Sequence, residues 1–156
     1  MKGNNFMKTG KTRKGKRKMW IIISIFAVAA VALGGGYLAT APGRQELMNV
    51  HLAALDFKKL RDGTYVGQYS GTKDHLRDAK VEVTVSAGKV SGIKVIDGKN
   101  VYKEGKPLEL RNGLTIEDLN NSVIKKQSLQ VDVISGATLT SNAYLKAMEN
   151  ALEQAE

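Results

Sequence analysis

A run of 23 residues without a charged side chain, Met19–Ala41, restricts the fold of this chain more than any other feature. A helix rises about 1.5 Å per residue, so a helix of this length spans the roughly 30 Å hydrocarbon core of a membrane. Trp20 and Tyr37 stand near its two ends, where aromatic side chains favour the membrane interface. The run therefore predicts one transmembrane helix at residues 19–41.

Positive charge is concentrated directly before this run. Residues 1–18 hold eight Lys or Arg and no acid, whereas Arg44 is the one basic residue just after the run. Basic residues flank membrane spans mainly on the cytoplasmic side, so we expect a disordered cytoplasmic arm at residues 1–18 and the rest outside the plasma membrane. The remainder is near neutral, with 24 − 8 = 16 basic residues against 15 acidic ones. Topology thus explains the basic arm, and no nucleic acid partner is expected.

A cleaved signal peptide is the alternative interpretation of the same segment. The basic arm, apolar Ile21–Leu33, three glycines and Ala39–Ala41 follow the order that signal peptides have. However, Pro42 would directly follow the cut, where a proline hinders signal peptidase, and the apolar run is long for such a peptide. We therefore expect an uncleaved, single-pass anchor.

The pattern beyond the run predicts a short stalk, residues 42–56, and one domain, residues 57–156. Side chains alternate between apolar and polar in Thr64–Ser70 and Ala79–Ser86, which is typical of half-buried strands. Ala87 and Gly88 supply a turn, and residues 90–96 return as a partner strand, so a hairpin is expected. Residues 101–112 are expected to form a loop or a short edge strand.

Two helices and one more strand are expected after the hairpin. Thr115 with acids at 117 and 118 predicts the start of a helix that ends near Lys125 and Lys126. The apolar run Leu129–Ile134 predicts a strand. An apolar stripe then predicts an amphipathic C-terminal helix; its members are Tyr144, Ala147, Met148, Ala151, Leu152 and Ala155. This order predicts an α+β fold, with helices packed on one face of a mainly antiparallel sheet.

Composition excludes several kinds of chemistry. The chain has no Cys, which excludes disulfides, thiolate metal sites, iron–sulfur clusters, c-type haem attachment and a lipoprotein anchor. The two histidines, His51 and His75, are far apart in sequence, so no metal site is expected. No hydrolase, metalloprotease or phosphate-loop motif is present. Asp62 and Asp132 are candidates for paired carboxylates, but nothing in the sequence places them at a substrate.

Small residues join the last expected strand to the last helix: Ser135, Gly136, Ala137 and Thr138. Free backbone N–H groups and the positive end of the helix dipole can bind a phosphate at such a turn. The alternative is that Thr138, Thr140 or Ser141 caps the helix and that Gly136 is an ordinary turn glycine.

The string Asp132-x-x-Ser135-Gly136-Ala137-Thr138 resembles the flavinylation motif of the FMN-binding domain family. That family includes subunits of the sodium-translocating NADH:quinone reductase and of the Rnf complex. Residues 62–67, DGTYVG, are similar to the DGxYxG opening of the same domain, and residues 79–90 are similar to its central hairpin. The resemblance covers about residues 57–155.

The resemblance implies that a flavin transferase joins the Thr138 hydroxyl to the phosphate of FMN as a phosphoester. Asp132 would serve recognition by the transferase. Residues 135–137 would let the phosphate approach, and the hydroxyls of Ser135 and Thr140 would donate hydrogen bonds to it. Tyr65 is a candidate for the pocket of the flavin ring, with a core tyrosine as the alternative.

The implied function is that of a membrane-anchored, extracytoplasmic flavoprotein that carries electrons on FMN, as in extracellular electron transfer. Its expected donor is a quinol-linked dehydrogenase or a larger redox complex of the membrane. We expect an electron carrier rather than a stand-alone enzyme. Two alternatives remain: a flavin-dependent extracellular reductase of a small acceptor, and a cofactor-free surface-binding module in which Thr138 is only a cap.

Overall fold

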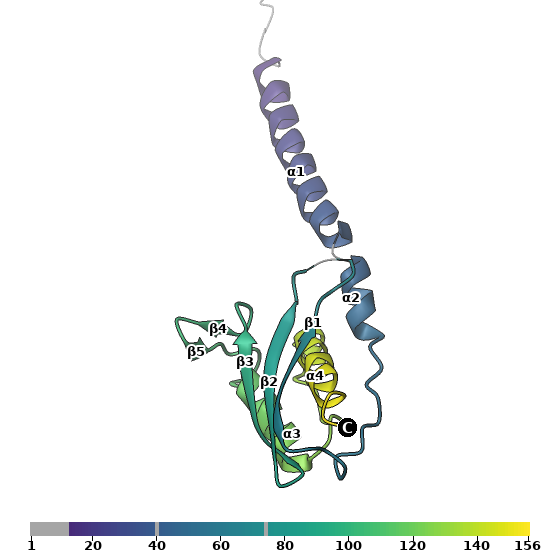
Figure 1. The fold of residues 1–156 in the computed structure, drawn as a ribbon. Coiled ribbons are helices and arrows are strands. Elements are labelled where there is room, and N and C mark those ends of the chain that lie inside the picture. The colour runs from purple at the N-terminus through teal and green to yellow at the C-terminus, as the bar shows by residue number, and fades with distance from the viewer. Residues whose placement is uncertain (1–12, 40, 74) are drawn as a thin grey trace, which may run out of the picture. The chain divides into compact units, whose positions relative to one another are not determined.

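The computed structural model describes residues 13–39, 41–73 and 75–156. The chain divides into two compact units, residues 1–39 and residues 40–156 (Figure 1). The first unit contains helix α1, Arg13–Ala39, so the last residues of the predicted disordered arm are helical; residues 1–12 lie outside the described residues. Across the described ranges, no helix combines the length and the apolar character that crossing a membrane requires.

The second unit is built on a three-stranded antiparallel sheet with the order β1-β2-β3. The strands are β1, Gly63–Tyr69, β2, Ala79–Ser86, and β3, Lys89–Asp97. Alternate side chains of the central strand β2 are buried, as the sequence pattern predicted. Ala87 and Gly88 both have positive φ, 54° and 68°, which is the backbone of a tight hairpin turn. The predicted hairpin is confirmed.

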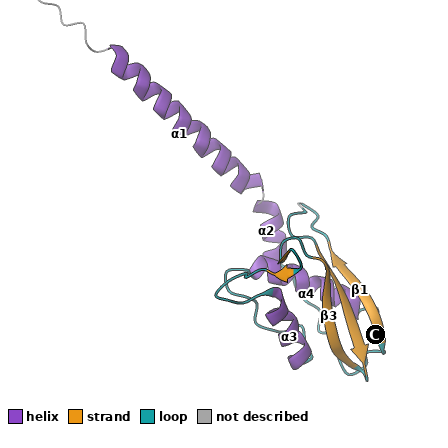
Figure 2. Ribbon diagram, turned by 90° about the vertical axis from the view of Figure 1, so that its left-hand side faces the viewer, coloured by secondary structure: helices purple, strands orange, loops and turns teal. Residues whose placement is uncertain are grey.

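Helices cover one face of this sheet (Figure 2). Helix α4, Thr138–Leu152, packs across β1 and β2, and helix α3, Ile116–Lys126, packs beside β3. Every member of the predicted apolar stripe is buried: Tyr144, Ala147, Met148, Ala151, Leu152 and Ala155. The predicted α+β fold with an antiparallel sheet is therefore confirmed. The start of α3 is also confirmed, because Thr115 and Asp118 form a reciprocal capping box.

Strand β1 and helix α4 approach each other closely at Gly67. A Cβ atom built at this position would overlap the Ala147 carbonyl oxygen and the Ala151 nitrogen, and would lie 2.8 Å from the Ala151 methyl carbon. A side chain at position 67 would therefore separate the helix from the sheet. This contact gives the second glycine of the DGTYVG segment a structural role.

Helix α2, Ala41–Met48, begins at the last residue of the predicted anchor, covers the start of the predicted stalk and packs on α4. Leu47 of α2 is buried, and its carbonyl oxygen accepts a hydrogen bond from the Asn142 amide at 2.8 Å. The boundary between stalk and domain at residue 56 stays a prediction. Strands β4, Tyr102–Lys103, and β5, Lys106–Pro107, form a small separate hairpin in the region expected to be loop or edge strand.

The strand predicted at Leu129–Ile134 is wrong. Leu129 and Ile134 are buried, but the segment joins neither described sheet. A side chain meets the edge of β3 instead: the Gln127 amide donates to the Val90 carbonyl at 2.8 Å and its oxygen accepts from the Val90 N–H at 2.9 Å. The apolar run at residues 129–134 thus correctly predicted buried side chains. It did not predict strand pairing, because the Gln127 side chain occupies the hydrogen-bonding groups of Val90 at the edge of β3.

Candidate cofactor site

The turn that leads into α4 is closed by backbone geometry that only glycine adopts easily. Gly136 has φ of 81°, and the Ala137 N–H donates to the Ile134 carbonyl at 2.8 Å. A Cβ atom at position 136 would also lie 3.2 Å from Cδ of Arg111, whose side chain passes against the turn. The predicted turn glycine is confirmed, and it also makes room for a neighbouring cation.

Helix α4 begins without a side-chain cap. Its N-cap residue is Ala137, and Thr138 is the first helical residue. The alternative in which Thr138, Thr140 or Ser141 is the N-cap is therefore wrong. The Ser141 N–H donates to the Ala137 carbonyl at 2.9 Å, but no side-chain cap accepts from the first N–H groups of the helix. These groups and the helix dipole attract an anion.

The hydroxyl groups near this turn differ in accessibility. Thr138 and Ser135 are exposed, and Thr140 is half-buried. Ser141 is fully buried: its hydroxyl donates to the Ala137 carbonyl at 3.1 Å and accepts from the Ile134 N–H at 3.2 Å. The hydrogen bonds of Ser141 therefore fix the backbone of the turn, while the Thr138 side chain is accessible to a modifying enzyme.

A pocket of about 230 Å³ opens at this helix start. Residues 136–140 line it together with Arg77, which comes from the loop between β1 and β2. Arg77 is half-buried, and its Nη1 atom is enclosed by protein and has no hydrogen-bond partner among the described residues. With Arg111 against Gly136, two guanidinium groups flank the start of α4. The site is suited to an anion such as a phosphate.

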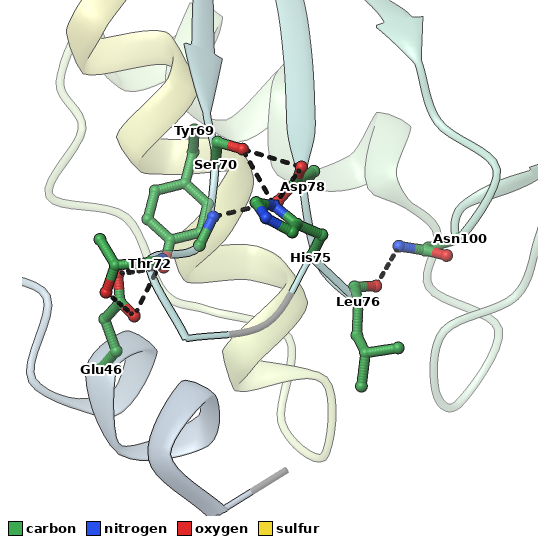
Figure 3. Close-up of polar contacts among 9 residues, drawn as sticks. Glu46, Tyr69, Ser70, Thr72, His75, Leu76, Asp78 and Asn100 are labelled. Atoms are coloured by element: carbon green, nitrogen blue, oxygen red, sulfur yellow. Dashed lines mark hydrogen bonds and ion pairs between the residues drawn. The ribbon is translucent and has the colours of Figure 1, made fainter. Parts of the chain in front are cut away.

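The loop that carries Arg77 is held on both sides of that residue (Figure 3). On one side, the Asn100 amide donates to the Leu76 carbonyl at 2.6 Å. On the other side, the Asp78 carboxylate accepts from the Ser70 hydroxyl at 2.8 Å. The neighbours of Arg77 on both sides, Leu76 and Asp78, are therefore each held by a hydrogen bond.

The same loop is tied to α2. The Glu46 carboxylate accepts from the hydroxyl of Thr72 at 2.9 Å and from that of Tyr69 at 3.2 Å. Burial raises the pKa of the Glu46 carboxyl, but hydrogen bonds from Thr72 and Tyr69 outweigh it, so the net pKa is lowered. The pKa of Asp78 is lowered in the same way, because hydrogen bonds led by the Gly71 N–H outweigh its burial. Both carboxylates therefore hold the loop in their charged form.

The Ser70, His75 and Asp78 side chains meet in this loop, but not as a nucleophile and its base. The Ser70 hydroxyl donates to Asp78 at 2.8 Å, and one His75 nitrogen, Nδ1, lies 3.1 Å from that carboxylate and 3.3 Å from the Ser70 oxygen. The His75 side chain is 75% exposed, so the group is open to water. The arrangement closes the loop and lacks the order that activates a serine.

Asp132 and Asp62 occupy separate environments. Asp132 is fully exposed and pairs with Lys126, with Nζ 3.2 Å from its oxygen. Asp62 accepts from the N–H groups of Gly88 and Ala87 at 2.8 and 3.0 Å, and these bonds lower the pKa of its carboxyl. Asp62 therefore stabilises the hairpin turn, and the structure does not join the two as paired carboxylates.

Tyr65 lies at the other end of α4 from Thr138. Its hydroxyl donates to the Arg61 carbonyl at 2.9 Å, and the Arg61 N–H donates to Ala155, beyond the end of the helix, at 2.8 Å. A helix of 15 residues is about 22 Å long. The structure thus brings Ser135, Gly136, Ala137, Thr138 and Thr140 together but leaves Tyr65 apart from them.

Two site residues carry no signal in the sequence. Arg77 stands in a turn and Arg111 in an isolated β-bridge with Leu114, both far along the chain from Thr138. Neither belongs to a motif, and only the packed loops bring them to the helix start.

A second hollow, of about 340 Å³, is lined by Asp132, Ser135 and apolar residues including Leu114.

Comparison with known proteins matches residues 75–153 to the model of the FMN-binding domain family. The NADH:acrylate oxidoreductase of Vibrio harveyi is 32% identical over 111 residues, which is 71% of this chain and 10% of that protein. An uncharacterized protein of Treponema pallidum (strain Nichols) is 28% identical over 96 residues, 62% of this chain and 24% of that protein. This chain thus spans a quarter or less of these relatives. The crystal structure of CPE2226 protein from Clostridium perfringens shares 28% identity, covers 62% of this chain and 88% of its own, and has a TM-score of 0.46.

Proposed function

The chain belongs to the FMN-binding domain family, and from that premise we propose that it carries electrons on an FMN joined to Thr138 by a phosphoester. One observation carries the proposal: the exposed Thr138 is the first residue of a helix whose N-terminus has no side-chain cap. A phosphate on this hydroxyl would lie beside unpaired N–H groups. The alternative role of Thr138 as a helix cap finds no support, since the N-cap is Ala137.

The residues around Thr138 fit a phosphate. Gly136 keeps the turn open, and Ser141 fixes its backbone from the buried side. Ser135 and Thr140 offer hydroxyl donors on either side of the attachment point. When bound, FMN supplies redox chemistry at its ring, while the protein supplies attachment and orientation. The full exposure of Asp132 suits recognition by a flavin transferase.

Substitution of Thr138 tests the attachment. Thr138→Val keeps the shape and removes the oxygen, so it should abolish covalent flavin in protein made together with the transferase. Asp132→Ala should impair attachment without removing the acceptor, and Thr140→Val should leave it largely intact. The readouts are the mass of the denatured protein, which should rise by one FMN less one water, and in-gel flavin fluorescence. A Thr138→Val protein with that increment would place the site elsewhere.

The proposed location is the outer face of the plasma membrane, with residues 19–41 as a single-pass anchor and the N-terminus in the cytoplasm. The support is the charge asymmetry of the sequence, eight basic residues before the run against Arg44 after it. A covalent tether suits this location, since a dissociated FMN would be lost by dilution. Protease added to intact protoplasts should digest the domain. Digestion only after lysis, or a mature chain beginning at Pro42, would contradict the anchored topology.

The proposed donor is a quinol-linked dehydrogenase or a redox complex of the same membrane. An electron carrier and a flavin-dependent reductase of a small extracellular acceptor differ in turnover. Steady reduction of an added small acceptor by the FMN-loaded protein, supplied with electrons artificially, would favour the reductase. Reoxidation only by a protein partner would favour the carrier.

A further inference from the structure

We propose that Arg77 binds the phosphate of the flavin at Thr138, and that this phosphate supplies the acceptor that its Nη1 atom lacks among the described residues. The proposal rests on the proposed function and assigns a phosphate-binding residue to it. Arg77 would be a positioning residue for the cofactor rather than a group that takes part in electron transfer.

The first observation is a buried, charged donor atom of Arg77 that lacks a hydrogen-bond acceptor among the described residues. Nη1 of Arg77 is enclosed by protein and has no hydrogen-bond partner, and among the described residues the side chain forms no ion pair. Removing a charged donor from water without giving it an acceptor is costly. An acceptor that arrives with a ligand would remove this cost.

The second observation is the pocket that Arg77 shares with the helix start. Arg77 and residues 136–140 line the same hollow of about 230 Å³. The N-terminus of α4 carries a positive partial charge and has no side-chain cap, so in the unmodified protein two positive groups face one space. A phosphodiester on Thr138 has one negative charge and two free oxygens, which can accept from a guanidinium and from backbone N–H groups together.

The third observation is that the Arg77 loop is positioned before any ligand binds. The Asn100 bond to the Leu76 carbonyl and the Ser70 bond to Asp78 hold the residues on both sides of Arg77 (Figure 3). Arg111, by contrast, is exposed where it passes Gly136. Water screens an exposed cation, so Arg111 should contribute less to phosphate binding than the half-buried Arg77.

This arrangement predicts opposite effects of one substitution in the two forms of the protein. Arg77→Gln removes the unpartnered cation, so the unmodified protein should keep or gain thermal stability. In the FMN-loaded protein the same change removes a phosphate contact, so the rise in Tm that FMN produces should fall by half or more. Arg111→Gln also removes one positive charge beside the turn before α4, and it should preserve most of the rise in Tm that FMN produces.

Phosphorus NMR reads the contact directly and needs no electron-transfer assay. The phosphodiester resonance of the folded, FMN-loaded protein should differ from its position after denaturation. Arg77→Gln should move it most of the way toward the denatured position, Arg77→Lys should move it partly, and Arg111→Gln should leave it near the wild-type position. An unchanged resonance in Arg77→Gln, an equal shift in Arg111→Gln, or an unmodified Arg77→Gln protein that does not fold would each overturn the proposal.

Inorganic phosphate separates this proposal from the proposed function. Added to unmodified protein, phosphate should shift the amide resonances of residues 138–140, and Arg77→Gln should weaken that binding by about 10- to 100-fold. If the wild-type protein gains no FMN by mass but shows this Arg77-dependent binding, covalent attachment fails and the Arg77 site stands. If FMN attaches and phosphate binding is the same in both proteins, the Arg77 site fails and attachment stands.

Discussion

Gly67→Ala should destabilise the domain strongly, because its methyl group has no space between β1 and α4. The new carbon would overlap two backbone atoms, the Ala147 oxygen and the Ala151 nitrogen, and would lie 2.8 Å from the Ala151 methyl. Backbone atoms cannot rotate away, so the strand and the helix must separate by about 1 Å. Overpacking typically costs about 1–3 kcal/mol, and we expect a loss of about 3 kcal/mol here. That is a large part of the roughly 5–15 kcal/mol that stabilises a typical domain.

Gly92→Ala in β3 is the matched control for this change. The atom nearest to a Cβ at position 92 is the Thr84 Cβ, at the ordinary contact distance of 3.8 Å. The free energy of unfolding should therefore change by less than about 1 kcal/mol, since only the backbone preference differs. Denaturant unfolding of the full chain, followed by circular dichroism, measures both variants. A Gly67→Ala protein within 1 kcal/mol of wild type would refute the close packing of β1 on α4.

Two further predictions concern the loop of residues 70–78 and the edge of β3. The carboxyls of Asp78 and Glu46 have pKa values lowered from their ordinary 3.8 and 4.5, so their stabilisation is complete above the ordinary values and is lost as the pH falls through the lowered ones. Amide exchange at Gly71 should therefore show increased opening below about pH 4 but no such change between about pH 5 and 7, and Asp78→Asn should remove this pH dependence. Gln127→Met keeps the length of the side chain but breaks both bonds to Val90, so unfolding should become easier by about 1–3 kcal/mol, whereas the exposed Gln130→Met should have little effect in the same denaturant assay.

The sequence by itself determined those features that depend on residues close together in the chain. Alternation predicted the hairpin of β2 and β3, since successive side chains of a strand face opposite sides. Thr115 and Asp118 predicted the start of α3, because a capping box spans only four residues. The apolar stripe predicted which face of α4 is buried. The motif that ends at Thr138 likewise placed the candidate attachment residue where a turn meets a helix, and Thr138 is the first residue of α4.

Tertiary structure decided the features that depend on which distant segments meet. The Gln127 side chain, rather than a fourth strand, bonds to Val90 at the edge of β3. Tyr65 lies at the far end of α4 because β1 and α4 pack along their lengths. Arg77 reaches the pocket of Thr138 because side chains from α2 and neighbouring loops hold its loop there. Local patterns report the preference of each segment for its own conformation, whereas these contacts arise only when the whole core packs.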